Sequence, residues 1–384
     1  MTNNKEKKVL NVPNLRFPEF EGEWMESTIG KQFELYSGNT PSRLNKDYFK
    51  GEINWISSGE LKDHYIYSSK EKISQEASLN LKMLPVGTFV IAIYGLEAEG
   101  VRGTGSIIKE KSTISQACMA FSSIGEVENE FLYSWYKKHG NIIGLKYAQG
   151  TKQQNLSYDI LERFKIAYPC KQEQEKLNKF ISLLDERIAT QNKIIEDLKK
   201  LKSAISERLF KSVKGSTVLL SDLCDIVKGK QINGENLSDS GNYYVMNGGT
   251  EPSGYYDNYN VEASTISISE GGNSCGYVQF NTSPFWSGGH CYSIQNIADK
   301  VDNMYLYHYL KSNEDAIMKL RIGSGLPNIQ KKDLAMFKII VPKIEWQIKI
   351  STFLSSLERK AEIEERIQNV MQKKKLYLLQ QMFI

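Results

Sequence analysis

The chain has 384 residues, of which 40% are apolar and 24% charged, and its net charge is +4. This length accommodates two domains with sizeable cores, and the composition excludes disordered and fibrous classes. The small net charge names no partner, so nucleic-acid binding would have to rest on where the charges lie. Five cysteines without a CxxC pair predict free thiols, and the sequence shows neither a signal peptide nor a membrane span. We therefore predict a soluble, cytoplasmic protein with no membrane partner.

The predicted elements begin with an extended N-terminal arm over residues 1–22, because the prolines at 13 and 18 prevent a continuous helix. An edge strand or a disordered lead-in is equally compatible with this segment. The first domain, residues 23–170, contains a short strand at 34–38 that ends at a glycine and precedes a polar loop. Its other predicted elements are strands at 88–94, 105–109 and 117–121, an amphipathic helix at 129–137, and a last strand at 164–168 before Pro169.

A long helix is predicted over residues 171–211, which contain neither proline nor glycine. Its apolar side chains follow steps of three and four, as in a heptad seam. The seam consists of Leu184, Ile188, Ile195, Leu198, Ile205 and Leu209. A helix of about 38 residues is about 57 Å long, too long to bury its apolar stripe on one compact domain.

The rest of the chain repeats this order. The stretch 323–347 repeats the stretch 150–174 at a constant offset of 173 residues, including Gln174 and Gln347. The second copy, residues 216–343, contains predicted strands at 225–229, 243–246, 265–269, 276–280 and 337–341 and an amphipathic helix at 303–311. A second long helix follows, and its predicted seam consists of Ile363, Ile367, Val370, Lys374 and Tyr377.

We therefore predict an α+β fold with two tandem globular domains. Two long antiparallel coiled-coil helices, within 171–215 and 344–384, separate the domains in a pseudo-two-fold arrangement and bury their seams against each other.

No known catalytic or metal-binding motif is recognised in the sequence. It lacks the Walker A, HExxH and GxSxG patterns, and its four histidines are scattered singly. The Asn-Pro-Pro-aromatic motif of amino-methyltransferases and a glycine-rich motif for S-adenosylmethionine are also missing. We predict no catalytic residue, no metal site and no cofactor bound by this chain.

Polar and basic side chains gather in glycine-rich loops at corresponding places in both copies. Asn and Gln pair with adenine and Arg with guanine, whereas Lys, Ser and Thr mostly contact phosphates. The first copy contributes Ser37, Asn39, Thr40, Ser42, Arg43, Lys46, Arg102, Thr104, Thr151, Lys152, Gln153 and Gln154. The second copy contributes Lys228, Lys230, Gln231, Asn247, Thr250, Asn273, Ser274, Arg321 and Ser324. These loops predict DNA binding, and solvated turns without a partner are the alternative.

An aromatic group in the second copy has two interpretations. Its side chains either stack on bases or belong to the core or a subunit interface, and the second interpretation is favoured. The group consists of Tyr243, Tyr244, Tyr255, Tyr256, Tyr259 and Trp286.

This layout resembles the specificity (S) subunits of Type I restriction–modification systems over nearly the whole chain. The resemblance rests on the doubled domain, on its order of elements and on the two long helices. The segments that carry it are residues 37–42, 150–156 and 323–329, Pro169 and Pro342, and residues 13–24, which also resemble staphylococcal members.

The resemblance implies that each domain is a target recognition domain for one half of a bipartite double-stranded DNA sequence. The helices would set the gap and dock two methyltransferase (M) subunits, which bring S-adenosylmethionine and methylate adenine. Restriction (R) subunits would add ATP- and Mg-dependent translocation and cleavage. One departure is that Lys230-Gln-Ile-Asn replaces Asn39-Thr-Pro-Ser, so contacts of the first loop do not transfer between domains. A protein-recognition scaffold and an enzyme of unrecognised type remain alternatives.

Overall fold

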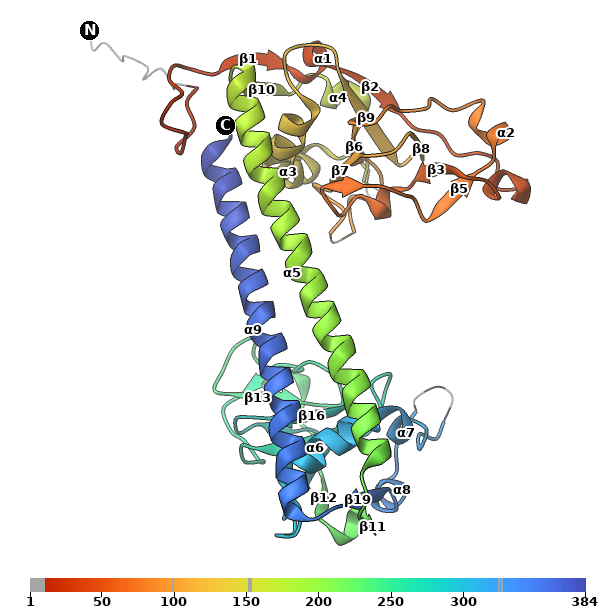
Figure 1. Ribbon diagram of the computed structural model, residues 1–384, viewed down its shortest axis with the longest axis vertical. Helices are drawn as coiled ribbons and strands as arrows, with labels where there is room; N and C mark the ends of the chain where they lie inside the picture. Colours follow the sequence, from red (N-terminus) through yellow and green to blue (C-terminus); the bar gives the residue numbers. More distant parts are fainter. Residues whose placement is uncertain (1–10, 99, 151–153, 324, 326) are drawn as a thin grey trace. The chain divides into compact units, whose positions relative to one another are not determined.

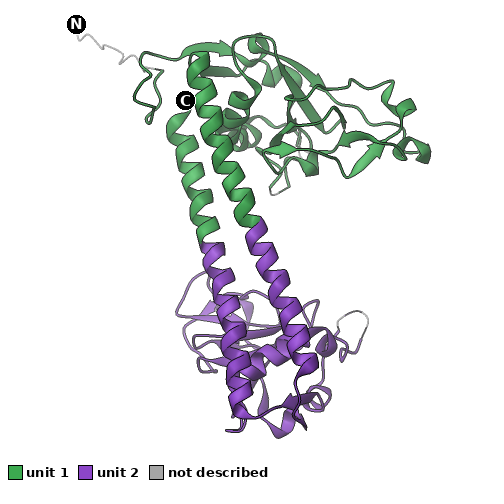
Figure 2. Cartoon of the chain, viewed as in Figure 1, with its two compact units in different colours: residues 1–192, 367–384 green, residues 193–366 purple. Residues whose placement is uncertain are grey.

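The computed structural model describes residues 11–384 except 99, 151–153, 324 and 326. The chain forms two compact units, unit 1 with residues 1–192 and 367–384 and unit 2 with residues 193–366 (Figure 2). Each unit combines a mixed α+β domain with part of α5 (Lys171–Ser212) and part of α9 (Ile344–Met382) (Figure 1). The predicted α+β class and the two long helices are confirmed.

Unit 1 is built on a five-stranded sheet in the order β2-β9-β6-β7-β4. A second sheet has the order β5-β3-β8, and β1 pairs with β10. Helix α3 packs on β6, β7 and β9. The elements are β1 (Met25–Thr28), α1 (Ile29–Gln32), β2 (Phe33–Ser37), β3 (Ile53–Ile56), β4 (Tyr65–Ile66), β5 (Glu71–Ile73), α2 (Gln75–Ser78), β6 (Phe89–Ala92), β7 (Gly105–Ile108), β8 (Ser112–Ile114), β9 (Cys118–Ser123), α3 (Asn129–Tyr147), α4 (Tyr158–Leu161) and β10 (Lys165–Tyr168).

Unit 2 contains a four-stranded sheet in the order β12-β18-β15-β16, a three-stranded sheet β14-β13-β17 and the pair β11-β19. Helix α6 packs on β16. The elements are β11 (Ser216–Leu219), β12 (Asp225–Lys228), β13 (Tyr243–Met246), β14 (Tyr255–Tyr256), β15 (Thr265–Ser269), β16 (Val278–Asn281), β17 (Trp286–Ser287), β18 (Cys291–Gln295), α6 (Asn303–Ser312), α7 (Glu314–Met318), α8 (Lys331–Ala335) and β19 (Lys338–Val341).

The two domains share one topology, which confirms the predicted duplication. Strands β12-β18-β15-β16 follow each other with the same antiparallel pairings as β2-β9-β6-β7. The parallel pair β13–β17 corresponds to β3–β8, and β11–β19 corresponds to β1–β10. The equivalence extends to backbone conformation: Ser264 has a φ of 58° directly before β15, where Gly87 has a φ of 88° before β6.

The repeated stretch forms the junction between each domain and the long helix that follows it. The amide of Gln174 is buried, donates to the carbonyls of Pro169 and Glu126, and accepts from the backbone N–H of Glu128. Gln347 makes the equivalent three bonds, to Pro342, Lys300 and Asp302. One glutamine therefore joins the domain's last strand, its main helix and the long helix, which explains why the stretch occurs twice.

Each domain core is completed by the start of one long helix and the end of the other. In unit 1, Leu177 and Ile181 of α5 and Phe383, which follows α9, are buried in the same cluster as the domain's aromatic residues. In unit 2, Ile350 and Leu354 of α9 join the cluster, together with residue 210 of α5. These positions are again related by 173 residues, so the helix ends belong to the folding units.

The N-terminal arm, residues 11–24, contains no helix or strand and lies against both long helices of unit 1. The Arg16 guanidinium makes two hydrogen bonds to Glu173, of 2.8 and 2.6 Å, and the Phe17 ring meets that of Phe180 edge-on. Leu15 N donates to the Gln381 carbonyl. The described part of the predicted arm, from residue 11 onward, has an irregular backbone; residues 1–10 lie outside the described part.

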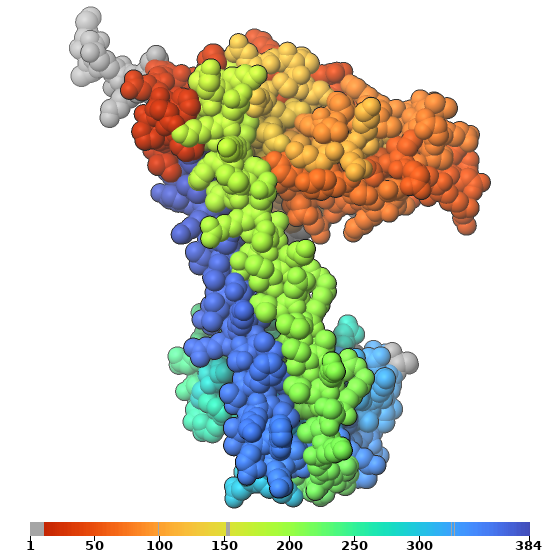
Figure 3. Space-filling model, in the orientation of Figure 1, coloured from red at the N-terminus to blue at the C-terminus, as the bar shows by residue number. Residues whose placement is uncertain are grey.

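Helices α5 and α9 lie side by side in each unit (Figure 3) and run antiparallel (Figure 1). Polar side chains make contacts between them. In unit 1, Asp185 pairs with Lys375; in unit 2, Glu358 pairs with Lys202 at 2.5 Å. Both pairs carry the 173-residue offset. The carboxylates of these two pairs also accept a hydrogen bond from a tyrosine of the adjoining domain: Asp185 from Tyr133, and Glu358 from Tyr307.

The α5 seam lies half-buried or buried, with Ile195 7% exposed. The predicted α9 seam is wrong: Ile363, Ile367, Val370 and Tyr377 are 43–59% exposed, and position 374 is exposed as well. The face of α9 that meets α5 instead carries Lys375, Gln368, Glu365 and Glu358. Ion pairs and hydrogen bonds therefore determine which face of α9 contacts α5. A search for regularly spaced apolar residues does not detect such contacts.

Candidate nucleic-acid interface

The candidate interface of unit 2 is the edge of its main sheet where β12 and β15 end and β18 begins. Gly229 follows β12, and its N–H donates to the Cys291 carbonyl at 2.9 Å. A Cβ on Gly229 would lie 2.2 Å from the Gly288 carbonyl oxygen, so only glycine allows the two segments to approach so closely. This close approach brings the loop that follows β12 beside the loop that precedes β18.

A charged cluster occupies this edge. Glu270 directly follows β15 and is 8% exposed. Its Oε1 lies 2.6 Å from Lys228 Nζ, and its Oε2 lies 3.6 Å from His290 Nδ1. The Tyr292 hydroxyl lies 3.3 Å from Oε1, and burial together with this carboxylate raises the pKa of Tyr292 to about 12. We call Lys228, Glu270, His290 and Tyr292 the Glu270 cluster.

The structure connects several predicted DNA-binding residues of unit 2 to this cluster. Lys228 belongs to it, and the Asn247 side chain accepts from His290 N at 3.2 Å. Gln231 lies against Gly289, and Lys230 N donates to Ser287 O at 2.8 Å. Other predicted residues lie on neighbouring turns of the described chain: Thr250, Asn273, Ser274 and Arg321. Ser324 lies outside the described residues.

Unit 1 presents the equivalent edge with other side chains. Gly38 N donates to the Cys118 carbonyl, as Gly229 does to Cys291, and a Cβ on Gly38 would lie 2.2 Å from Ser115 O. Ser37 and Asn39 are exposed on either side of it, and the Asn39 side chain accepts from Thr40 N. Ser42 and Lys46 are exposed on the same loop. The loop is thus fixed by its glycine and presents small polar groups.

Arg43 is already paired in this structure. Its guanidinium makes two hydrogen bonds to Glu71, of 2.6 and 2.8 Å, and lies over the Phe49 ring at 4.1 Å. The hydrogen bonds to Arg43 lower the pKa of Glu71. Contact with a base would therefore require Arg43 to exchange one partner for another.

The remaining predicted residues of unit 1 lie around α3 and a neighbouring loop. The stem of Arg102 lies against Gly144 of α3, and Thr104 Oγ1 donates to the Val101 carbonyl. Gln154 N donates to Glu97 at 2.9 Å, which lowers the pKa of that carboxyl. Thr151, Lys152 and Gln153 lie outside the described residues. The DNA contacts assigned to all these residues stay predictions.

The aromatic residues of unit 2 pack mainly on one another. Tyr244 stacks on Phe285, and Tyr256 meets Trp286 edge-on. The Trp286 indole N–H donates to the Lys230 carbonyl, which ties this aromatic group to the candidate interface. A structural role, favoured from the sequence, agrees with these contacts.

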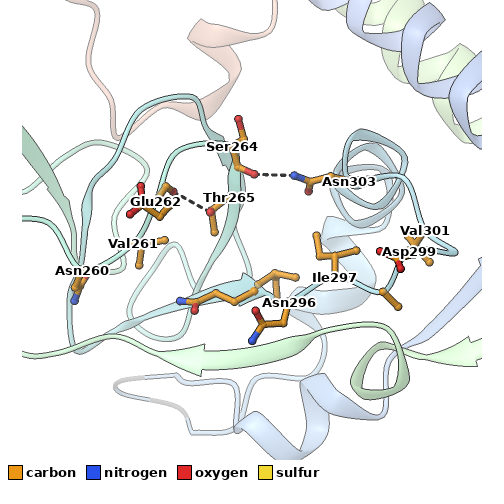
Figure 4. Close-up of a pocket in the computed structure, with 13 residues that line it drawn as sticks. Asn260, Val261, Glu262, Ser264, Thr265, Asn296, Ile297, Asp299, Val301 and Asn303 are labelled. Carbon is orange, nitrogen blue, oxygen red and sulfur yellow. Dashed lines mark hydrogen bonds between the residues drawn. The ribbon is translucent and has the colours of Figure 1, made fainter.

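Three pockets lie away from these loops, two in unit 2 and one in unit 1. One pocket of unit 2, of about 480 Å³, is lined by residues at the start of β15 and the end of β18 (Figure 4). The Glu270 cluster lies at the other end of these two strands. Within the pocket, Asn303 donates to the Ser264 carbonyl at 2.7 Å, which holds the loop before β15 on helix α6. Asn129 donates to Gly87 O in unit 1 in the same way. Because the same hydrogen bond occurs in both units, we assign the Asn303 side chain at this pocket a structural role. The pocket of unit 1 has a volume of about 710 Å³.

The geometry thus provides each unit with a sheet edge that presents loop side chains. Among the described residues, no group of three or more His, Cys, Asp or Glu side chains could hold a metal ion. None of the described helices has the length and apolar character needed to cross a membrane. Glu270 and His290 were not predicted from the sequence. The position of Glu270 directly before Gly271-Gly272 could have indicated a site residue, because the glycine-rich loops were the predicted binding loops.

Two copies of one domain, each with such an edge and each joined to a long helix, define the class of this protein as a duplicated two-domain chain. The family described as Type I restriction modification DNA specificity domain matches residues 21–200 and again residues 214–373. The chain therefore belongs to this family and carries its domain twice.

Named relatives are consistent with this membership. The MjaIX Type I restriction enzyme specificity subunit of Methanocaldococcus jannaschii is 30% identical over 187 residues, 47% of this chain and 42% of that protein. The MjaVIII specificity subunit of the same organism is 23% identical over 97% of this chain and 94% of its own length. Matches to the first three curated relatives span only 31–42% of those proteins.

A solved structure shares the fold along nearly the whole chain. The S subunit of a Type I restriction–modification system from Mycoplasma genitalium matches 97% of this chain and 99% of its own, with a TM-score of 0.66. Sequence identity is 18%, so this similarity concerns the fold alone.

Proposed function

We propose that this chain is the non-catalytic, sequence-specific DNA-recognition subunit of a Type I restriction–modification complex. Residues 23–170 and 216–343 would each read one half of a bipartite target. The observation that carries this proposal is that one family-specific domain occurs twice with the same backbone edge and different side chains on it. Two readers of different half-sites require that combination, because the backbone positions the contacts and the side chains select the bases.

The long helices are proposed to set the distance between the half-sites and to dock two M subunits. The exposed stripe of Ile363, Ile367, Val370 and Tyr377 on α9 supports the docking role. Its steps of four, three and seven residues fit the heptad spacing that a helix of a partner chain would match. Exposed apolar side chains that share one face of a helix are typical of surfaces that bind another protein.

The cofactors are assigned to the partners. The M subunits would bring S-adenosylmethionine and methylate one adenine in each half-site, and R subunits would bring ATP and Mg. The small net charge of +4 is compatible with this division of labour, because the partners would share the phosphate contacts that usually dominate affinity. The complex would work on cytoplasmic DNA.

The test is to express the full chain with its M subunits and map adenine methylation across a genome. We expect one split motif, with a constant gap between two short half-sites. Methylation without a motif, or none at all in a complex that assembles, would contradict the proposal. Binding of a protein ligand by both domains, without DNA, would support the scaffold alternative instead.

A further inference from the structure

The edge of unit 2 differs from that of unit 1 at one buried position in particular. Backbone hydrogen bonds establish which residues are equivalent: Ile329 N donates to the Glu270 carbonyl at 2.8 Å, and Leu156 N donates to the Ile93 carbonyl at 2.9 Å. Glu270 therefore occupies the place of Ile93, which is 2% exposed. A buried carboxylate stands in one domain where its sister domain has an isoleucine.

The neighbours of this position change with it. The strand registers place Lys228 opposite Tyr292, and Ser37 opposite Met119. The residues of unit 1 that correspond to Lys228, His290 and Tyr292 are Ser37, Ala117 and Met119. The differences between the units therefore occur together: where unit 2 has the acidic Glu270, it also has Lys228 and His290, which can pair with it.

The fold itself does not require the cluster. In unit 1 the apolar side chain of Ile93 occupies the same buried position of the sheet edge. Burying a carboxylate there costs free energy unless its partners compensate for the lost hydration. Of the two oxygens of Glu270, Oε2 is buried and makes no hydrogen bond within the described residues. A buried, incompletely satisfied charge at a surface edge is characteristic of a functional site.

The two basic side chains of the cluster face the solvent. Lys228 and His290 have side chains 52% and 61% exposed, and both approach the buried carboxylate from the solvent side. Glu270 therefore holds the Lys228 ammonium, while the His290 ring lies with Nδ1 on the side of the carboxylate, 3.6 Å from Oε2 and beyond hydrogen-bond distance. An Nδ1–H that faces Glu270 leaves His290 Nε2 as an acceptor.

We propose that the Glu270 cluster reads one G·C base pair in the half-site of unit 2, an inference that rests on the function proposed above. The Lys228 ammonium donates to guanine O6 or N7, and His290 Nε2 accepts from the cytosine N4 amino group. A G·C pair presents these acceptors and this donor side by side in the major groove. Glu270 is a positioning residue, because it acts on the bases through Lys228 and His290.

The experiment compares the methylation motif of the full chain with M subunits for the wild type and for Lys228→Met, His290→Ala and Glu270→Gln. We expect the preference for one G·C pair in one half-site to fall about tenfold or more, while every other position is retained. Lys228→Arg should preserve the preference, since arginine also pairs with guanine. Lys300→Met, in the loop after the far end of β18, is the control and should leave the motif unchanged.

Two further outcomes separate the possible failures. An unchanged motif in all three variants, or a uniform loss at every sequence, would overturn the inference; the latter is the behaviour of a phosphate contact. Because Lys228 and His290 are exposed, their variants should fold, and the retained other positions in the half-site of unit 2 report that they do. Glu270→Ile, which introduces the residue of unit 1, should fold and lose the preference. A wild type that shows no motif would refute the proposed function instead.

Discussion

Individual buried histidines couple the stability of unit 2 and unit 1 to pH in opposite directions. His308 is 2% exposed, and its Nε2 lies 2.9 Å from Ser355 Oγ. Burial is the main cause that lowers the pKa of His308 to about 4. A histidine in an unfolded chain has a pKa near 6.5. Between this pH and about 4, the unfolded chain therefore binds a proton at His308 that folded unit 2 does not bind.

We predict that unit 2 loses stability as the pH falls from about 6.5 to about 4. The loss should reach about 3 kcal/mol, because each unit of pKa difference corresponds to about 1.4 kcal/mol. Denaturant unfolding of the wild type and of His308→Gln at pH 7.5, 6 and 5 measures it. Equal pH slopes in the two proteins would show that His308 is not the cause.

His64 should have the opposite effect in unit 1. Burial lowers its pKa, but two nearby carboxylates outweigh the burial and leave the pKa raised: Asp185 lies 2.9 Å from Nδ1, and Glu130 is hydrogen-bonded to Nε2 at 2.8 Å. Its stabilising contribution is complete below about pH 6.5 and is lost as the pH rises through the raised value. Asp185→Asn weakens that contribution and should therefore flatten the pH dependence of unit 1.

The residue scale also shows where sequence reasoning stops. Glycines at 38 and 229 and the amides around them could be predicted as loop residues from the sequence alone. Glu270 and His290 could not be assigned to one cluster, because 19 residues separate them in the chain. Only the antiparallel pairing of β15 with β18 places them at the same edge.

At the scale of elements, the junction glutamines make a clear prediction. Replacing Gln174 by leucine leaves a buried N–H and two carbonyls without their partner, and each such group costs about 1–3 kcal/mol. We expect Gln174→Leu to destabilise unit 1 by roughly 2–4 kcal/mol, and Gln347→Leu to do the same in unit 2. Chemical denaturation measures both.

Gln172 provides the matched control, because it lies two residues earlier in the same helix and is exposed. Gln172→Leu should change the free energy of unfolding by less than about 0.5 kcal/mol. A cost for Gln174→Leu no larger than this would remove the junction role that we assign to the repeated stretch.

The long helices mark both the success and the limit of pattern reading. Their existence follows from two long segments without proline or glycine and with periodic apolar residues. The contact face of α9 was predicted wrongly, because periodicity identifies an apolar stripe but not which partner it meets. In each unit, ion pairs such as Asp185 with Lys375 occupy the α5–α9 contact and leave the apolar stripe exposed.

For the whole molecule, the proposed spacer role predicts a change in the target's gap. Inserting four residues into α5, with a matching insertion in α9, adds about 6 Å and is close to one helical turn, so the faces of the helices are largely preserved. Nearly two base pairs span this length at about 3.4 Å each. The methylation motif should keep both half-sites and lengthen their gap.

The same four residues inserted after Ser240, in an exposed loop of unit 2, provide the control and should leave the gap unchanged. If the helix insertion also leaves the gap unchanged while methylation persists, the helices do not set the spacing.

The central claim is that each domain reads one half-site independently of the other. Its most direct test is to replace residues 23–170 by the first domain of another family member and to map adenine methylation with the same M subunits. The account predicts that one half of the motif changes, while the other half and the gap stay as they were. A change in both halves, or in neither, would contradict it.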